Sequence, residues 1–431
     1  MSRELHLLAF GNTRSTGPWR HPDIDNSTAG VRRRLISHAQ TAEAGTFDAL
    51  FFADGLNYGP PATWPYKITE DFEPLTATAA LSAVTERIGL VVTGSATLAH
   101  PYHLARQLLS LDHLSGGRAG WNLVTSFAQA AADNFSARGV VAHDERYRVA
   151  EEALEVVRKL WDGWGEDTIV EDRASGIFND VNKIQPTDHH GRYFDVAGPL
   201  GAARSAQGRP VIFQAGASPR GVRFAAENAE AIFVAAPTKA ILRDVVSKVR
   251  DELILAGRDP YDAKIYTLLT IITDSTPEAA RAKAAEYQSY ASTEGALVFM
   301  SGWMGIDLAS YEIDEPIGNV HSNAIQSAVA AFQQASDTGE EWRVRDIAAW
   351  GGIGGMGPVL IGSGDEVAEA LQDWVTETDV DGFNLAYAIT PGTFEDIVEF
   401  IVPELRRRGA YPSEYAPGTT AARHRFLTRN R

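Results

Sequence analysis

The sequence contains no cysteine. This absence excludes disulfide scaffolds, thiolate metal sites, iron–sulfur clusters and a cysteine nucleophile. No run of about 18 apolar residues occurs, so we expect no membrane-spanning segment. The N-terminal stretch Met1–Phe10 has no long apolar run followed by a small-residue cleavage site. It therefore does not look like a signal peptide, and we expect a cytoplasmic protein.

Positively charged side chains are also fewer than negatively charged ones. The chain has 39 Lys and Arg residues against 56 Asp and Glu residues, a formal net charge of −17. A protein this acidic repels phosphate backbones and anionic lipid surfaces. We therefore expect neither a nucleic-acid partner nor a membrane partner.

What the chain does have is enough apolar material for a large core, since 44% of its 431 residues are hydrophobic. Eight short, nearly continuous apolar segments alternate with helical patterns, as is typical of parallel strands covered on both faces. The segments are His6–Phe10, Ala49–Ala53, Ile88–Thr93, Arg118–Val124, Val211–Ala215, Ala231–Ala235, Ile265–Ile272 and Gly382–Leu385. This α/β pattern predicts a (β/α)₈ TIM barrel, with a doubly wound sheet as the competing fold.

We expect residues 1–431 to form one barrel domain. Two stretches, at about 165–210 and 292–358, are too long for simple loops, and we expect insertions there at the carboxyl-terminal rim. Helices are predicted at Glu73–Val84 and Asp144–Trp164, and a closing helix at Phe394–Arg408.

One glycine motif resembles a dinucleotide fingerprint, with glycines at 352, 354 and 357. That fingerprint must follow a strand and open a helix, whereas here Pro358 and a strand-like segment, Val359–Ile361, come next. We interpret Gly351–Gly357 as a loop. His189 and His190 are adjacent in the sequence. Adjacent side chains rarely bind one metal ion together, and we expect no metal site.

Several polar residues follow predicted strands. Gln214–Ser218 links an apolar strand to a helical pattern at Val222–Ala229, where backbone N–H groups suit a phosphate, although a plain capped helix has the same pattern. His143 and Tyr147 lie one helical turn apart and can both donate to an anion, although in isolation ordinary surface placement at a helix start is the better interpretation. Asp54 and Thr93 end two other strands, where barrel sites are built.

Taken together, these segments resemble the bacterial luciferase-like FMN-dependent monooxygenases, within them the nitrilotriacetate, EDTA and dibenzothiophene-sulfone monooxygenase branch. The resemblance runs over nearly the whole chain. It is carried by EPLTATAALSAVTERIGLVVTGSAT, HPYHLARQLLSLDHLSGGRAGWNLVTS, HDERY, GRYFDVAGPL, GRPVIFQAGAS, GWMGIDL, DGFNL and VPELRRRG.

The resemblance implies a barrel that binds reduced FMN at its carboxyl-terminal face. It implies that Asp54 and Thr93 contact the isoalloxazine or ribityl region, and that His143 and Tyr147 reach toward the ribityl chain and phosphate. Ser218, with the backbone of Gly216 and Ala217, would hold the phosphate. His143 is also a candidate contributor to catalysis, and no other catalytic residue is assigned.

The implied reaction uses O₂ and FMNH₂ from a separate NAD(P)H:flavin reductase to oxidise, and cleave, a C–N or C–S bond in a small organic substrate. We expect a homo-oligomer and an aromatic substrate wall, made of Phe10, Tyr58, Trp64, Tyr66 and Trp303. Three alternatives remain open. They are a deazaflavin-dependent dehydrogenase on the same scaffold, a non-catalytic flavin-binding protein and a metal-dependent barrel hydrolase.

Overall fold

The computed structural model describes residues 4–12, 18–69, 72–135, 142–216, 218–304, 306–316, 342–353 and 357–420. Its centre is a closed barrel of eight parallel strands, in which β1 pairs with both β2 and β13. The strands are β1 (His6–Phe10), β2 (Ala49–Phe52), β3 (Gly89–Ser95), β4 (Ala119–Val124), β9 (Val211–Ala215), β10 (Ala231–Val234), β11 (Lys264–Asp274) and β13 (Gly382–Ala386). The predicted barrel is confirmed, and the doubly wound sheet is excluded because the sheet closes on itself.

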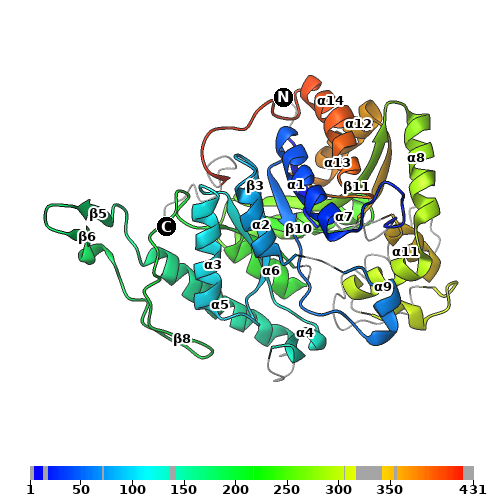
Figure 1. The fold of residues 1–431 in the computed structure, drawn as a ribbon. Helices are drawn as coiled ribbons and strands as arrows, with labels where there is room; N and C mark the ends of the chain where they lie inside the picture. The colour runs from blue at the N-terminus through cyan, green and yellow to red at the C-terminus, as the bar shows by residue number, and fades with distance from the viewer. Residues whose placement is uncertain are drawn as a thin grey trace.

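Helices surround this barrel (Figure 1). They include α1 (Thr28–Ala44), α2 (Pro74–Ser82), α3 (Pro101–Leu114), α4 (Gln129–Asp133), α5 (His143–Asp162), α6 (Pro219–Asn228), α7 (Lys239–Leu255), α8 (Pro277–Tyr290) and α12 (Gly364–Thr378). The helix predicted at Glu73–Val84 is observed as α2. The Glu73 carboxylate caps it by accepting from the backbone N–H groups of Leu75 and Thr76. The predicted closing helix consists of α13 (Gly392–Asp396), a π-helical turn at Ile397–Ile401 and α14 (Val402–Arg407).

Aromatic side chains fill the interior of the barrel. The ring of Phe233, on β10, lies 4.5 Å from that of Phe51, on β2 across the barrel, and 5.7 Å from that of Phe213, on the neighbouring strand β9. Phe10 packs edge-on against Phe51 at 5.4 Å. The contact between Phe51 and Phe233 spans the barrel, and the rings of Phe10 and Phe213 pack against that pair. These four rings therefore identify the inward-pointing side chains of their strands.

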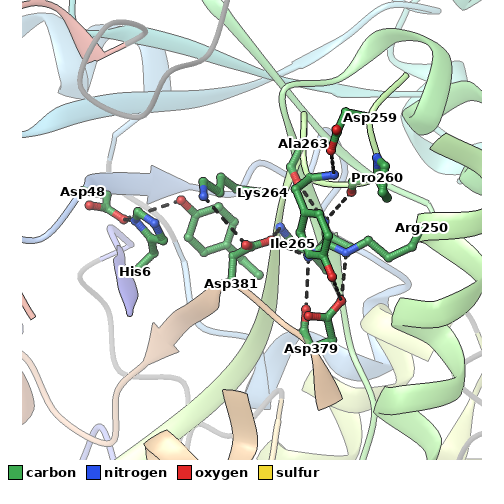
Figure 2. A network of polar contacts seen from close by, with 12 residues as sticks. His6, Asp48, Arg250, Asp259, Pro260, Ala263, Lys264, Ile265, Asp379 and Asp381 are labelled. Atoms are coloured by element: carbon green, nitrogen blue, oxygen red, sulfur yellow. Dashed lines mark hydrogen bonds and ion pairs between the residues drawn. The ribbon is translucent and has the colours of Figure 1, made fainter. Parts of the chain in front are cut away.

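A buried polar network closes the amino-terminal end of the barrel, as Figure 2 shows. His6 Nδ1 lies 3.0 Å from Asp48 Oδ2, and Arg250 Nη2 lies 2.8 Å from Asp381 Oδ2. Burial disfavours the charged imidazole, but the Asp48 carboxylate outweighs it and raises the pKa of His6. Burial likewise opposes ionisation of Asp381, but the Arg250 guanidinium lowers the pKa of that carboxyl. These charge pairs thus lie at the end of the barrel opposite the strand termini at which sites are built, and removal of one partner would leave the other charge buried and unpaired.

A ninth strand, β12 (Val359–Ser363), pairs in parallel with the far end of β11, outside the closed barrel. It follows α11 (Val344–Gly351) and the glycine-rich segment, so the order is helix, glycines, strand, the reverse of a dinucleotide fingerprint. Gly357 is required for packing, because a Cβ there would overlap the carbonyl oxygen of Leu268. Gly354 lies outside the described residues.

The two long stretches leave the barrel at different ends. Residues 165–210 follow the C-terminal end of α5, and Gln207 Nε2 donates to the carbonyl of Ala119, the first residue of β4, at 2.8 Å. This stretch therefore starts at the amino-terminal side, because α5 runs antiparallel to the strands. It then returns along α5 toward the expected rim, where Arg192 Nη2 lies 2.8 Å from Glu145 Oε1 in the first turn of α5. It forms two hairpins, β5 (Ile169–Asp172) with β6 (Ile177–Asn179), and β7 (His189–His190) with β8 (Asp195–Val196).

The described residues at the start of the second long stretch do lie at the carboxyl-terminal rim. Its helix α9 (Thr293–Met304) packs against a 3₁₀ helix at Pro61–Tyr66, which follows β2. Arg20, in the segment after β1, donates to the carbonyl of Tyr290 at 3.1 Å. In the part of the chain that the structure describes, no helix is long and apolar enough to cross a membrane.

Candidate active site

The first turn of α6 lies directly after the carboxyl end of β9. Ser218 is the N-cap residue, and its Oγ accepts from the backbone N–H of Gly221 at 3.1 Å. Pro219 occupies the first helical position, where its missing N–H costs nothing. The remaining N–H groups of this turn and the positive end of the helix dipole have the character that an anion requires.

Tyr147 brings a second donor to the same turn from α5. Its ring is buried against Phe224 at 5.6 Å, and the Arg220 guanidinium lies over it at 5.4 Å. Its hydroxyl faces Gly221, since a Cβ at position 221 would lie 2.6 Å from that oxygen. Within the described residues the Tyr147 hydroxyl makes no hydrogen bond, so it is available to a ligand at the start of α6.

Gly216 completes a cradle at this point. A Cβ at position 216 would lie 3.0 Å from Gly221 Cα and 2.6 Å from Gln214 Nε2. The backbones of Gly216 and Gly221 therefore approach so closely that neither position accommodates a side chain without movement. Such a bare stretch of backbone lets a bulky anion reach the N–H groups. Ala217 lies outside the described residues.

His143 is the first residue of α5 and is exposed. Its Nδ1 pairs with Asp144 Oδ1 at 2.8 Å, and its ring lies 5.3 Å from that of Tyr147. The hydrogen bond from His143 lowers the pKa of Asp144. The structure thus brings His143, Tyr147, Gly216 and Ser218, separated by up to 75 positions in sequence, to one corner between α5 and α6.

A second polar group lies at the ends of β2, β3 and β4. Thr93 Oγ1 donates to the carbonyl of Phe52 at 2.7 Å and accepts from Asn122 Nδ2 at 2.9 Å. In strand register Thr93 pairs with Asn122, and Asn122 with Phe213, so all three point to the same side of the sheet. Because Phe213 stacks on Phe233, whose ring reaches Phe51 across the barrel, that side is the interior.

Asn122 leaves one strong acceptor unused. Its residue is 3% exposed, and its Oδ1 has no hydrogen-bond partner among the described residues. A buried amide oxygen without a partner costs about 1–3 kcal/mol, so it marks a place where a ligand donor would be stabilising. The sequence analysis missed Asn122. The available signal was one amide at an inward position of an otherwise apolar strand.

Asp54 lies two residues beyond the end of β2. The last residue of β2, Phe52, accepts the hydrogen bond from Thr93. Burial, together with the nearby Glu73 carboxylate, raises the pKa of the Asp54 carboxyl. Among the described residues, no other predicted site residue makes a hydrogen bond with Asp54. Arg220, which pairs with Glu151 and covers the Tyr147 ring, was also missed, because nothing in its local sequence marks it.

The proposed aromatic wall separates into different environments. Phe10 is buried inside the barrel, whereas Tyr58, Trp64 and Tyr66 are exposed on the segment between β2 and α2. Tyr58 and Trp64 lie together, with ring centroids 6.1 Å apart. Trp303 belongs to α9, which packs on that segment, but its side chain lies outside the described residues.

Among the described residues, no group of three or more His, Asp or Glu side chains is placed to hold a metal ion. His189 instead packs beside Glu152 at 3.4 Å and Lys159 at 3.2 Å. Glu152 also accepts from the backbone N–H groups of Tyr193 and Phe194, so this cluster anchors the β7–β8 hairpin to α5.

Comparison with known proteins gives matches along almost the entire chain. The family described as luciferase-like monooxygenase matches residues 16–382. The dimethyl-sulfide monooxygenase of Hyphomicrobium sulfonivorans is 41% identical, over 97% of this chain and 90% of that protein. The dibenzothiophene-sulfone monooxygenase of Rhodococcus erythropolis (strain XP) is 37% identical, over 97% and 95%. Component A of the nitrilotriacetate monooxygenase of Aminobacter aminovorans is 34% identical, over 96% and 94%.

Solved structures agree with these sequence matches. The crystal structure of DmoA from Hyphomicrobium sulfonivorans has a TM-score of 0.88 at 39% identity and covers 100% of this chain and 93% of its own. A riboflavin lyase solved with modified FMN and riboflavin has a TM-score of 0.87 at 33% identity, over 99% and 96%. An F420-dependent secondary alcohol dehydrogenase has a TM-score of 0.58 at 15% identity, over 94% and 100%, a likeness of fold alone.

Proposed function

The chain belongs to the luciferase-like monooxygenase family, and we propose that it uses reduced FMN and O₂ to oxidise a small organosulfur compound and cleave a C–S bond. The names of two relatives support a sulfur substrate, since one is a dimethyl-sulfide and one a dibenzothiophene-sulfone monooxygenase. A C–N substrate is the second class to test, because another relative is a nitrilotriacetate monooxygenase component.

The observation that carries this proposal is the corner between α5 and α6. There Tyr147 and Ser218 present hydroxyl groups to a helix N-terminus whose Gly216 and Gly221 leave the backbone bare. This combination of donors, helix dipole and open backbone fits the phosphate of FMN. Arg220 adds positive charge beside it, although its ion pair with Glu151 offsets part of that charge.

The second polar group fits the other end of the same cofactor. Asn122 Oδ1, buried and without a partner among the described residues, would accept a hydrogen bond from an N–H group of the isoalloxazine ring. Thr93 holds the Asn122 amide in place, because its Oγ1 accepts a hydrogen bond from Asn122 Nδ2. Asp54, with its raised pKa, borders this position and would contact the ring or the ribityl chain.

Reduced FMN, when bound, supplies the electrons that activate O₂. The protein's own contribution is to position the ring and to keep water from it. The aromatic floor made by Phe10, Phe51 and Phe233 closes the barrel beneath the strand ends. Tyr58, Trp64 and α9 stand at the rim, where they would contact the substrate.

The site has no dinucleotide fingerprint, so we propose that a separate NAD(P)H:flavin reductase delivers the reduced flavin. The printed name of one relative, component A of a monooxygenase, supports a system of more than one component. His143 is exposed beside Tyr147, and we assign it to the ribityl chain and phosphate.

The test begins with anaerobic titration of the purified chain with photoreduced FMN. An oxygen pulse with ¹⁸O-labelled O₂ follows, in the presence of dimethyl sulfide, dibenzothiophene sulfone or nitrilotriacetate. We expect saturable FMN binding and labelled product from a sulfur compound. Binding without labelled product from any of the three would overturn the substrate class, and absence of FMN binding would overturn the cofactor assignment.

A further inference from the structure

Gln214 follows the inward-pointing Phe213 directly on β9. Side chains alternate along a strand, so Gln214 points away from the barrel interior and toward the helices outside it. Its neighbours in strand register are Leu123 on β4 and Ile232 on β10, and both are apolar and buried. The fold thus places one amide at a position where the adjoining strands carry hydrocarbon side chains.

The Gln214 amide is buried and lacks a hydrogen-bond partner. The residue is 2% exposed, and its Oε1 is unpaired among the described residues. Its Nε2 donates no hydrogen bond within that part of the chain either. A buried amide without partners destabilises a folded chain relative to a hydrocarbon side chain of similar size. Its presence here indicates a ligand that pairs with it.

The amide lies against the glycine cradle of the proposed phosphate site. A Cβ at position 216 would lie 2.6 Å from Gln214 Nε2, 3.0 Å from Gln214 Oε1 and 3.0 Å from Gly221 Cα. The carboxamide and the first turn of α6 therefore converge on Gly216. The two ends of a carboxamide exchange places by rotation about one bond, so the NH₂ group can turn toward a ligand that accepts hydrogen bonds.

Tyr147 supplies a second unpartnered group beside the same cradle. Its hydroxyl faces Gly221, whose Cα lies next to Gly216. Tyr147 is buried like Gln214, and both side chains are neutral donors. Donors that converge on bare backbone at the start of a helix suit a phosphate group.

We propose that Gln214 donates an amide N–H to the phosphate of FMN and thereby makes the site select the phosphorylated flavin over riboflavin. This inference rests on the proposed function, since it requires that the cradle binds the phosphate. Riboflavin has no phosphate and leaves the Gln214 amide without a partner, so the amide contributes to the binding of FMN alone.

The test compares the affinities for FMN and for riboflavin, measured by fluorescence titration of each purified variant. Gln214→Met keeps the approximate volume of the side chain but removes the donor, and we expect FMN to bind about tenfold more weakly. Gln214→Glu places a carboxylate beside the phosphate, and we expect a loss of about a hundredfold. Both variants should bind riboflavin as the unaltered chain does. Gln288→Glu adds the same charge at an exposed position of α8 and should leave both affinities unchanged.

A role of Gln214 in packing alone predicts a different pattern. Its variants would then weaken FMN and riboflavin by equal factors, and that result would overturn the inference. An unchanged FMN affinity in Gln214→Met would overturn it as well. Failure of the unaltered chain to bind FMN would instead overturn the proposed function, so the two failures are distinguishable.

Two further measurements separate ligand binding from folding. Without flavin, Gln214→Met should unfold at the same temperature as the unaltered chain or at a higher one, because it removes an unpartnered buried amide. With FMN bound, the ³¹P NMR resonance of the cofactor should move in Gln214→Met and stay in place in Gln288→Glu. An unmoved resonance in Gln214→Met would show that the amide does not contact the phosphate.

Discussion

The hydroxyl of Tyr147, on α5, faces the backbone of Gly221 in the first turn of α6, so closely that a Cβ at position 221 would lie 2.6 Å from the phenolic oxygen. The two residues are 74 positions apart in the sequence. Their contact joins two helix N-termini at one corner of the barrel, and the proposed phosphate site consists of this corner together with Ser218.

Removing both hydroxyl donors tests that site. We expect Ser218→Ala combined with Tyr147→Phe to weaken FMN binding by about 1–3 kcal/mol, through lost charge-assisted hydrogen bonds. Fluorescence titration of FMN measures the change. Ser363→Ala is the control, since it removes a comparable N-cap from α12, which follows a strand outside the barrel. Equal affinity in the double variant and the unaltered chain would remove the phosphate assignment.

Filling the cradle is a complementary test. Gly221→Ala should displace the Tyr147 ring or the turn itself, because its Cβ has no room beside the phenolic oxygen or Gly216 Cα. We expect at least a tenfold loss of FMN affinity. Gly201→Ala, at a position with no atom within 4 Å of the added Cβ, should bind FMN as the unaltered chain does. The assignment of the cradle fails if both variants bind equally well.

The buried His38 should make stability depend on pH. Burial lowers its pKa to about 4, against the opposing effect of its hydrogen bond with the carbonyl of Phe10 at 3.0 Å. Between about pH 6.5 and 4 the unfolded chain therefore binds the extra proton, and stability is lost as the pH falls. The shift corresponds to about 3 kcal/mol.

His38→Gln keeps a donor for Phe10 but has no charge to gain. Urea unfolding at pH 7, 5.5 and 4 should show the variant gaining on the unaltered chain by about 3 kcal/mol as the pH falls. Parallel pH curves for the two proteins would contradict a neutral, buried His38.

The network in Figure 2 predicts a large effect on stability with little effect on the site. Arg250→Met removes the main partner of the buried Asp381 carboxylate and should cost about 3–5 kcal/mol of unfolding free energy. Arg345→Met breaks an exposed ion pair with Asp314 and should cost less than about 1 kcal/mol. Chemical denaturation measures both. Because Arg250 lies at the amino-terminal end, FMN affinity of the folded variant should stay unchanged.

Local sequence already predicted much of this molecule. The eight predicted apolar segments are the eight barrel strands. A strand covered on both faces is apolar along its whole length, and the amino-acid sequence shows such segments directly. The caps of α2 and α6, at Glu73 and Ser218, depend on neighbouring residues only. The resemblance to luciferase-like monooxygenases is confirmed by the family match over residues 16–382.

Other features depend on contacts between distant segments, and only the tertiary structure decided them. The pairing of Tyr147 with Gly221, the inward amide of Asn122 and the cover of Arg220 over Tyr147 all need the closed barrel. The start of the 165–210 stretch at the amino-terminal side followed from the direction of α5, which no local pattern reveals. Sequence determined which elements form, because their propensities and caps are local, whereas the site and the exposed β5–β6 hairpin arose from how those elements pack.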